Sequence, residues 1–386
     1  MPASVKMMLI KDQKPSAKKT NKRKISVNEM ECKSPLRAMT ELKSVPSFDP
    51  QFLAAKNPHA LDLTIKFIEK THTYYVKFHT QPFSCEQVMS TSGFVGNYFS
   101  HFDPDKIVKN MGQRTRSTKY RGMTNEQIKE VWRKNGEEAS TIGTNFHFLL
   151  ESFYNGMDLK PFDNFKVIQQ FRRWHAKYVV LHKLVEFRSE QRMRTNLKTR
   201  LTGTADMLFA LPSQNPESGT LKLVLRDWKF SKKISFSSPF PGSYGCCSHL
   251  DNCNYSKYLL QQNVYKYMLE KFYTNWKYQG NVYPRVEIVD MALAVFHDLQ
   301  DDYQHIDIPS VQNVVEEMFL DREQQLKYLL AGEEKKAEAV IMGVIKTPTL
   351  VHDVSKASVK VLQQPEPEII LVDTDEEDDE PLEPLA

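Results

Sequence analysis

Two aspartates stand in strand-like sequence that would ordinarily carry apolar or hydroxyl side chains. Residues 201–233 read LTGTADMLFALPSQNPESGTLKLVLRDWKFSKK, and the turn-like PSQNPESG between two β-forming runs predicts a long-looped hairpin. Facing positions of a hairpin have a constant index sum, so we expect Asp206 and Asp227 side by side. Lys229 lies two residues beyond Asp227 and therefore on the same strand face. This combination predicts a metal site with a cation beside it.

A predicted helix ahead of the hairpin adds two candidates, His147 and Glu151, which are four residues apart and share one helix face. Each of these groups alone is more often a partnered structural residue. Their joint occurrence with the two aspartates and the lysine favours chemistry. Two carboxylates suit Mg²⁺ or Mn²⁺, and a histidine nitrogen shifts the preference toward Mn²⁺. Such metals bridge phosphate oxygens and lower the pKa of a bound water.

The elements that must position these residues alternate along the chain, which indicates an α/β or α+β layer fold. Thr124, with Gln127 three residues on, has the pattern of a capping box. Thr144 is predicted to cap a separate helix that ends at Asn155 and Gly156. Strands are predicted within residues 66–85, 185–195, 201–211, 220–230 and 286–298, and helices within 124–140, 144–155, 164–182, 257–273 and 310–330.

Composition and charge divide the 386-residue chain into three parts. Residues 1–48 are predicted to be a disordered basic arm, because KKTNKRK (Lys18–Lys24) and its surroundings cannot bury enough apolar surface to order themselves. Residues 49–332 form the predicted folded domain. Residues 333–386 form a flexible tail, whose last 22 residues hold ten acidic residues and no Lys or Arg. Five cysteines, no secretory signal and no apolar run of membrane-spanning length predict a soluble intracellular protein without a membrane partner.

The motifs GTNFHFLLE, GTAD, RDWK and QQNVY resemble, in this order, those of the PD-(D/E)XK nuclease superfamily, in its RecB-type and lambda-exonuclease-like branch. The resemblance covers roughly residues 60–320 and implies a restriction-endonuclease-like core, with a mixed central sheet flanked by helices. It implies metal binding by Asp206, Asp227 and His147, with Lys229 as the catalytic lysine and Glu151 as an accompanying acid. Gln261 and Tyr265 match a Gln-x-x-x-Tyr motif that supports the site and contacts nucleic acid.

The predicted function is therefore a metal-dependent DNA nuclease that uses Mg²⁺ or Mn²⁺, with exonuclease action in replication, recombination or repair as the expected form. Its partner is single- or double-stranded DNA. The competing class is a non-catalytic nucleic-acid-binding or scaffold protein that retains the fold. The intact set of Asp206, Asp227 and Lys229 argues against that class, since a binding module has no need of all three.

Three other stretches have compositions that bear on function. KNMGQRTRSTKYRG is a cationic loop suited to phosphate contacts or to simple solvation, with Arg114, Arg116, Lys119 and Arg121 as candidates. CCSHLDNC suggests zinc, but its spacing fits no ordinary knuckle. In the tail, a short apolar run before the acidic stretch resembles a SUMO-interacting motif, which would add a strand to a partner's sheet. Together with the basic arm it favours a nuclear over a cytoplasmic setting. The run consists of Ile369, Ile370, Leu371 and Val372.

Overall fold

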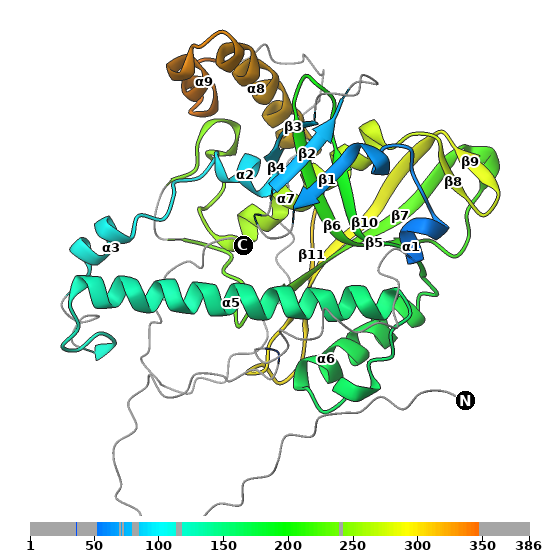
Figure 1. The fold of residues 1–386 in the computed structure, drawn as a ribbon, viewed down its shortest axis with the longest axis horizontal. Helices are drawn as coiled ribbons and strands as arrows, with labels where there is room; N and C mark the ends of the chain where they lie inside the picture. Colours follow the sequence, from blue (N-terminus) through cyan, green and yellow to red (C-terminus); the bar gives the residue numbers. More distant parts are fainter. Residues whose placement is uncertain are drawn as a thin grey trace, which may run out of the picture. The chain divides into compact units, whose positions relative to one another are not determined.

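A mixed β-sheet with helices packed on both faces organises the chain (Figure 1). The structure is a computed structural model that describes Leu36 and residues 52–68, 71, 73–78, 85–112, 118–238 and 242–346. All of them belong to one unit, Ser34–Ala386. The sheet order is β11-β10-β7-β6-β4, and β5 also pairs with β6. Its strands are β4 (Met89–Ser90), β5 (Val185–Arg194), β6 (Leu201–Ala210), β7 (Thr220–Phe230), β10 (Arg285–Phe296) and β11 (Gln304–Asp307).

Strand directions in this sheet are mixed. β5, β6 and β7 are successive antiparallel neighbours, whereas β10 runs parallel to β7 after the crossover through α7 (Asn254–Phe272). This is an α/β fold with a mixed central sheet flanked by helices, as predicted. Two smaller sheets accompany it, one of β1 (Ile65–Ile68), β2 (Thr73–Lys77) and β3 (Cys85–Gln87), the other of β8 (Trp276–Tyr278) and β9 (Asn281–Tyr283).

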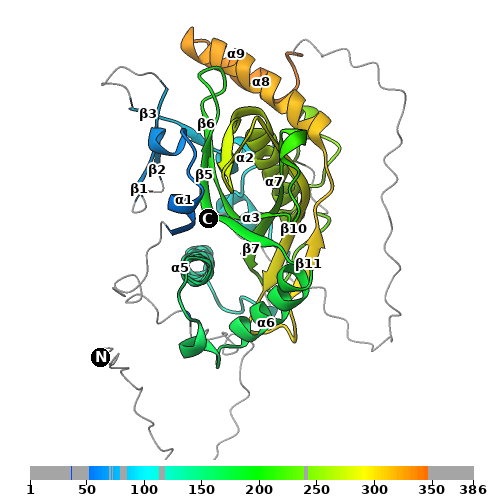
Figure 2. The same ribbon diagram turned by 90° about the vertical axis from the view of Figure 1, so that its right-hand side faces the viewer.

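Two apolar cores lie on opposite faces of the sheet. The long helices α7 and α8 pack into one core, with Leu260 and Val315 fully buried there. Helices α5, seen nearly end-on in Figure 2, and α6 pack into the other, with Phe146 and Trp174 fully buried. The α-helices are α1 (Phe52–Lys56), α2 (Thr91–Gly96), α3 (Pro104–Asn110), α5 (Asn125–Tyr154), α6 (Lys166–His175), α7 (Asn254–Phe272), α8 (Gln312–Leu330) and α9 (Glu334–Ile341). Shorter turns are the 3₁₀ segments Asp62–Thr64, Lys160–Phe162, Pro216–Ser218 and Gly245–Cys247 and the π-helical turn Ala176–Val180.

Helix α5 is one continuous 30-residue helix. The predicted capping box is confirmed, since the Thr124 side chain accepts from the Gln127 N–H and the Gln127 side chain accepts from the Thr124 N–H. The predicted helix start at Thr144 is wrong, because Thr144 lies inside α5. Burial of apolar residues such as Phe146 holds the helix together through the weak helix former Gly143. The predicted end at Asn155 is confirmed.

The folded region extends beyond both predicted limits. Leu36, inside the predicted N-terminal arm, is fully buried, and Asn145 Nδ2 donates a hydrogen bond to its carbonyl at 2.8 Å. Helix α9 lies past residue 332, where a tail was expected, and its Ile341 joins the core on the α7 face. Within the described residues no helix is long and apolar enough to cross a membrane.

The β6–β7 hairpin has the predicted register, and it opens where the acids stand. Its ladder runs from Ala210 opposite Leu223 to Met207 opposite Arg226, and Gly219 turns the chain with φ +62°. Further back along β6, β4 replaces β7 as the neighbour and pairs with residues 201–202. Residues 203–206, which spell GTAD, have neither strand beside them on that edge. The two strands therefore separate at the GTAD motif.

Two buried side chains approach the backbone of β6 closely at position 203, which explains why this residue is glycine. A β-carbon there would lie 2.6 Å from both Thr91 Oγ1 and Tyr265 Cε1, and both side chains are buried. We expect Gly203→Ala to lower the free energy of unfolding by about 1–3 kcal/mol, the usual cost of overpacking. Gly143→Ala is the matched control, because a β-carbon at this helical position meets nothing within 4 Å. It should stabilise by up to about 1 kcal/mol. Urea unfolding measures both, and equal shifts would contradict the close approach.

Candidate metal centre

Three carboxylates meet on three neighbouring strands. The β6–β7 register places Asp206 of β6 opposite Asp227 of β7, one step past the last ladder pair. The β5–β6 register, with Ser189 opposite Met207 and Gln191 opposite Ala205, places Glu190 opposite Asp206 on the other side. The acids thus form a row across β5, β6 and β7. Burial deepens along it, since the side-chain exposures of Glu190, Asp206 and Asp227 are 27%, 10% and 3%.

Helix α5 adds a nitrogen donor to this row. His147 Nδ1 lies 3.6 Å from Asp206 Oδ2 and 3.8 Å from Glu190 Oε1. One donor atom each from His147, Glu190 and Asp206 falls within 4.8 Å of the other two. Among the described residues no other group of three His, Cys, Asp or Glu donors is this close. One nitrogen and two carboxylate donors fit a divalent cation of the Mn²⁺ or Mg²⁺ type.

Asp206 also accepts a backbone hydrogen bond where β6 and β7 separate. Its Oδ2 accepts a 2.7 Å hydrogen bond from the Trp228 N–H, which lies beyond the last β6–β7 pair. A buried N–H without a partner costs about 1–3 kcal/mol, so the carboxylate stands in for the missing carbonyl of the ladder. The aspartate that faces His147 is therefore held in place by the main chain of β7.

Asp227 is fixed by two partners. Gln262 Nε2 of α7 donates to Oδ1 at 2.8 Å, and Lys229 Nζ forms an ion pair with Oδ2 at 2.7 Å. The Lys229 ammonium also lies 4.4 Å from the centre of the Tyr258 ring, an arrangement that attracts a cation to the aromatic face. Lys229 is thus on the Asp227 side of its strand, as predicted, and 18% of its side chain is exposed.

The crowding of charge shifts the pKa of each central group. Burial raises the pKa of Asp206 to about 7, because the charges of Asp227 and Glu190 add to it while those of His147 and Lys229 only partly oppose it. Burial lowers the pKa of His147, but Asp206 and Glu190 outweigh it and raise that pKa to about 9. Burial likewise opposes the charge of Lys229, and Asp227 overcomes it, so that its pKa is raised. In the metal-free protein at neutral pH, His147 and Lys229 are both cationic.

Two tyrosines wall the site. Tyr265 of α7 packs against the backbone at Gly203 and is 4% exposed. Tyr74 of β2 shares a 2.8 Å hydrogen bond with Thr204 Oγ1, two residues before Asp206. Burial raises the pKa of both hydroxyls, and the nearby carboxylates raise it further. Neither tyrosine is a proton donor or acceptor that titrates near neutral pH in this setting.

Other residues predicted for the site stand apart from the donor group. Glu151 is half-buried on α5 and is not one of the three mutually close donors. Gln261 points elsewhere, since its Nε2 donates to Ser92 Oγ at 3.1 Å. Lys119 and Arg121 precede α5, and the helix rise puts its first turn roughly 33 Å from His147. Arg114, Arg116 and the apolar run 369–372 lie outside the described residues, so their roles stay predictions.

Sequence reasoning missed Glu190 and Gln262. The constant index sum used for the β6–β7 hairpin would have found Glu190 if applied to the β5–β6 hairpin as well. Gln262 could not be separated from its neighbour Gln261, because the orientation of α7 about its axis depends on what it packs against. Its contact with Asp227 is a product of the fold.

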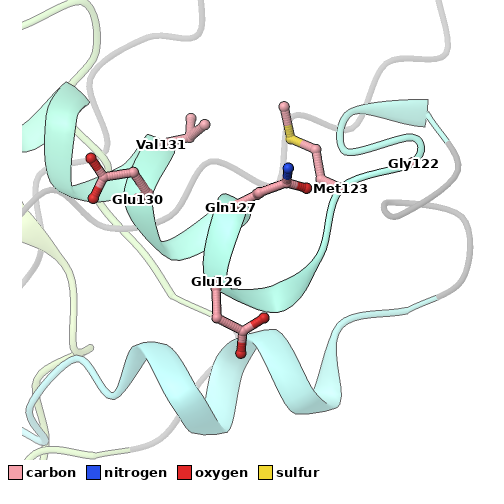
Figure 3. Close-up of a pocket in the computed structure, with 6 residues that line it drawn as sticks. All are labelled: Gly122, Met123, Glu126, Gln127, Glu130 and Val131. Carbon is pink, nitrogen blue, oxygen red and sulfur yellow. The ribbon is translucent and has the colours of Figure 1, made fainter.

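Two further features lie outside the donor group of His147, Glu190 and Asp206. An open hollow at the first turns of α5 is lined by Gly122, Met123, Glu126, Gln127, Glu130 and Val131 (Figure 3). It lies about 25–30 Å along the helix from His147. The cysteines of CCSHLDNC are free thiols. Among the described residues these cysteines and His249 do not form a group of three mutually close donors.

Comparison with models of known protein families found no match, and no curated protein matches the chain significantly. The class of site therefore has to be argued from its geometry and chemistry.

If Glu190 is a ligand, Glu190→Gln should weaken Mn²⁺ binding by at least about tenfold, because a charged oxygen donor is lost. Glu151→Gln changes the same group on an acid outside the cluster and should alter the affinity less than about threefold. Isothermal titration calorimetry with Mn²⁺ alone measures both variants. A larger effect at Glu151 than at Glu190 would contradict the assignment of ligands.

Metal binding should also release protons. His147 must lose its proton to donate Nδ1, and Asp206 must be ionised. With pKa values of about 9 and about 7, the apparent Mn²⁺ affinity should rise as the pH increases from 6 to 8. Calorimetry in two buffers of different ionisation enthalpy counts the protons. Binding that is independent of pH and releases no proton would contradict ligation by His147.

Proposed function

We propose that this protein is a metal-dependent nuclease that hydrolyses phosphodiester bonds in DNA. The observation that carries the proposal is the row of Glu190, Asp206 and Asp227 with His147 on one side and the Lys229 ammonium on the other. A scaffold protein has no reason to gather three acids, two of them largely buried, around one point, since their mutual repulsion costs stability. The predicted resemblance to PD-(D/E)XK nucleases agrees with this arrangement and with the strand order β5, β6, β7 and then β10.

His147, Glu190 and Asp206 are the residues that would hold the cation, with Asp227 beside them. A bound divalent cation supplies a water of lowered pKa and offsets negative charge on the phosphate. The chain's own contribution is positioning. The Trp228 N–H orients Asp206, and Gln262 orients Asp227. These side chains are therefore set before substrate arrives, which is the condition for electrostatic stabilisation of a transition state.

Lys229 supplies the positive charge next to the acids. Its ammonium, steered by Asp227 and the Tyr258 ring, is placed to donate hydrogen bonds to the attacking water and to a phosphate oxygen. In the metal-free protein its pKa is raised, so it is a donor rather than a base. To help deprotonate the water, Lys229 would first have to lose its ion pair with Asp227, because this contact raises its pKa.

Lys229→Met tests the proposal, because methionine keeps much of the aliphatic stem and removes the charge. Cleavage of end-labelled DNA with Mn²⁺ should fall by at least about a hundredfold, the usual loss for one electrostatic or proton-transfer group. DNA affinity at fixed salt should change less than about tenfold, since other backbone contacts remain. Asp206→Asn should abolish cleavage through loss of the cation. Wild-type protein that cuts neither single- nor double-stranded DNA with Mn²⁺ or Mg²⁺ would leave the scaffold class.

A further inference from the structure

An exposed arginine follows the acidic row on β5. Arg192 lies two residues beyond Glu190 and opposite Thr204, which itself lies two residues before Asp206. On β6, Thr204 and Asp206 are two residues apart, which is about 6.6–6.8 Å in an extended strand. Arg192 is therefore on the same strand as Glu190, the most exposed acid of the donor group, and two residues from it.

Aromatic side chains of the neighbouring small sheet hold this arginine on the side of the metal site. The Arg192 guanidinium carbon lies 5.5 Å from the centre of the Phe67 ring, and the Phe67 and Tyr74 rings are 4.4 Å apart. Tyr74 is in turn tied to Thr204 by the 2.8 Å hydrogen bond. The charges of Glu190, Arg192 and Asp206 all influence the pKa of Tyr74, after the dominant effect of its burial. The guanidinium and the acids are thus all near one tyrosine.

Arg192 differs in its partners from the nearby arginines. Arg194 lies over the Phe78 ring, and its guanidinium donates hydrogen bonds to Thr64 Oγ1 and the Thr195 carbonyl. The others pair with carboxylates. Arg188 pairs with Asp62, Arg200 with Glu86 and Arg226 with Asp290. Among the described residues no carboxylate lies within 4.0 Å of the Arg192 guanidinium, which lies over the face of Phe67. An arginine stacked on a ring keeps its N–H groups in a plane that matches two phosphate oxygens.

We propose that Arg192 binds the backbone phosphate next to the scissile one and so sets the path of the DNA strand away from the metal centre. This inference rests on the proposed nuclease function for the position of the scissile phosphate. The spacing supports it, because one strand step on the protein resembles the step between successive phosphates of a polynucleotide. The charge of the site supports the proposal too. A DNA strand that approaches three carboxylates is repelled by them unless cations lie nearby.

A thermodynamic cycle between protein and DNA tests the contact. The probe is a short fluorescein-labelled single-stranded oligodeoxynucleotide, with one phosphate at a time replaced by an uncharged methylphosphonate. Fluorescence anisotropy with Ca²⁺ in place of Mn²⁺ measures binding without relying on turnover. The proteins are wild type, Arg192→Met, Arg192→Lys and the control Lys335→Met, which removes an exposed cation on α9.

Arg192→Met should bind the unmodified strand about tenfold more weakly, the loss expected for one charged hydrogen-bonded contact, and its salt dependence should fall by about one phosphate. Wild type should lose the same factor when one particular phosphate is neutralised, and Arg192→Met should lose nothing further at that position. Arg192→Lys should recover part of the affinity because the charge returns. Lys335→Met should behave as wild type throughout.

Losses that add at every phosphate position, or wild-type affinity in Arg192→Met, would overturn the inference and leave Arg192 as a packing partner of Phe67. Failure of the nuclease proposal is read separately. If wild type shows the position-specific coupling yet never cuts DNA with Mn²⁺, the phosphate contact stands and the catalytic role falls. If wild type cuts DNA but shows no coupling at Arg192, the reverse holds.

Discussion

The parting of β6 from β7 at the Met207–Arg226 pair is the constraint on which the site depends. A paired sheet would occupy its edge groups with backbone hydrogen bonds and leave no space for a cation. Once the strands part, the exposed N–H of Trp228 needs an acceptor, and Asp206 provides one. The same carboxylate is thereby turned toward His147. The hydrogen bond from the Trp228 N–H thus also positions Asp206 as a candidate metal ligand.

The separation of β6 from β7 also determines how the helices pack around the site. Helix α7 approaches the sheet closely where Gly203 leaves room, and this approach brings Tyr265 and Gln262 to the acids. On the opposite face, α5 delivers His147 from a stretch whose apolar neighbours, including Phe146, are buried in the second core. The two faces of the sheet therefore contribute to one site through a gap between strands. Each core fixes the side chains that its own helix supplies.

The sequence predicted the parts of this site that depend on local periodicity. The index sum of the hairpin placed Asp206 opposite Asp227, and strand alternation placed Lys229 beside Asp227. The sequence did not predict the features that depend on tertiary contacts. A threonine inside a helix can have the same local sequence as one that caps it, so local pattern does not distinguish the two roles of Thr144, and the burial of α5 decides between them. Glu190 has φ +45°, a backbone state that few non-glycine residues adopt and that no local signal announces.

The two glutamines of α7 have a consequence for how the chain can vary. Gln261 reaches Ser92 on α2, whereas Gln262 reaches Asp227, so adjacent residues serve different layers. Inserting one residue ahead of them would rotate this face by about 100°, because an α-helix has 3.6 residues per turn. The hairpin loop around Gly219 lies at the end of the β6–β7 ladder away from the acids, and a change in its length would not rotate Gln261 and Gln262. Length changes should accumulate in that loop among homologous chains, and α7 should keep its residue count.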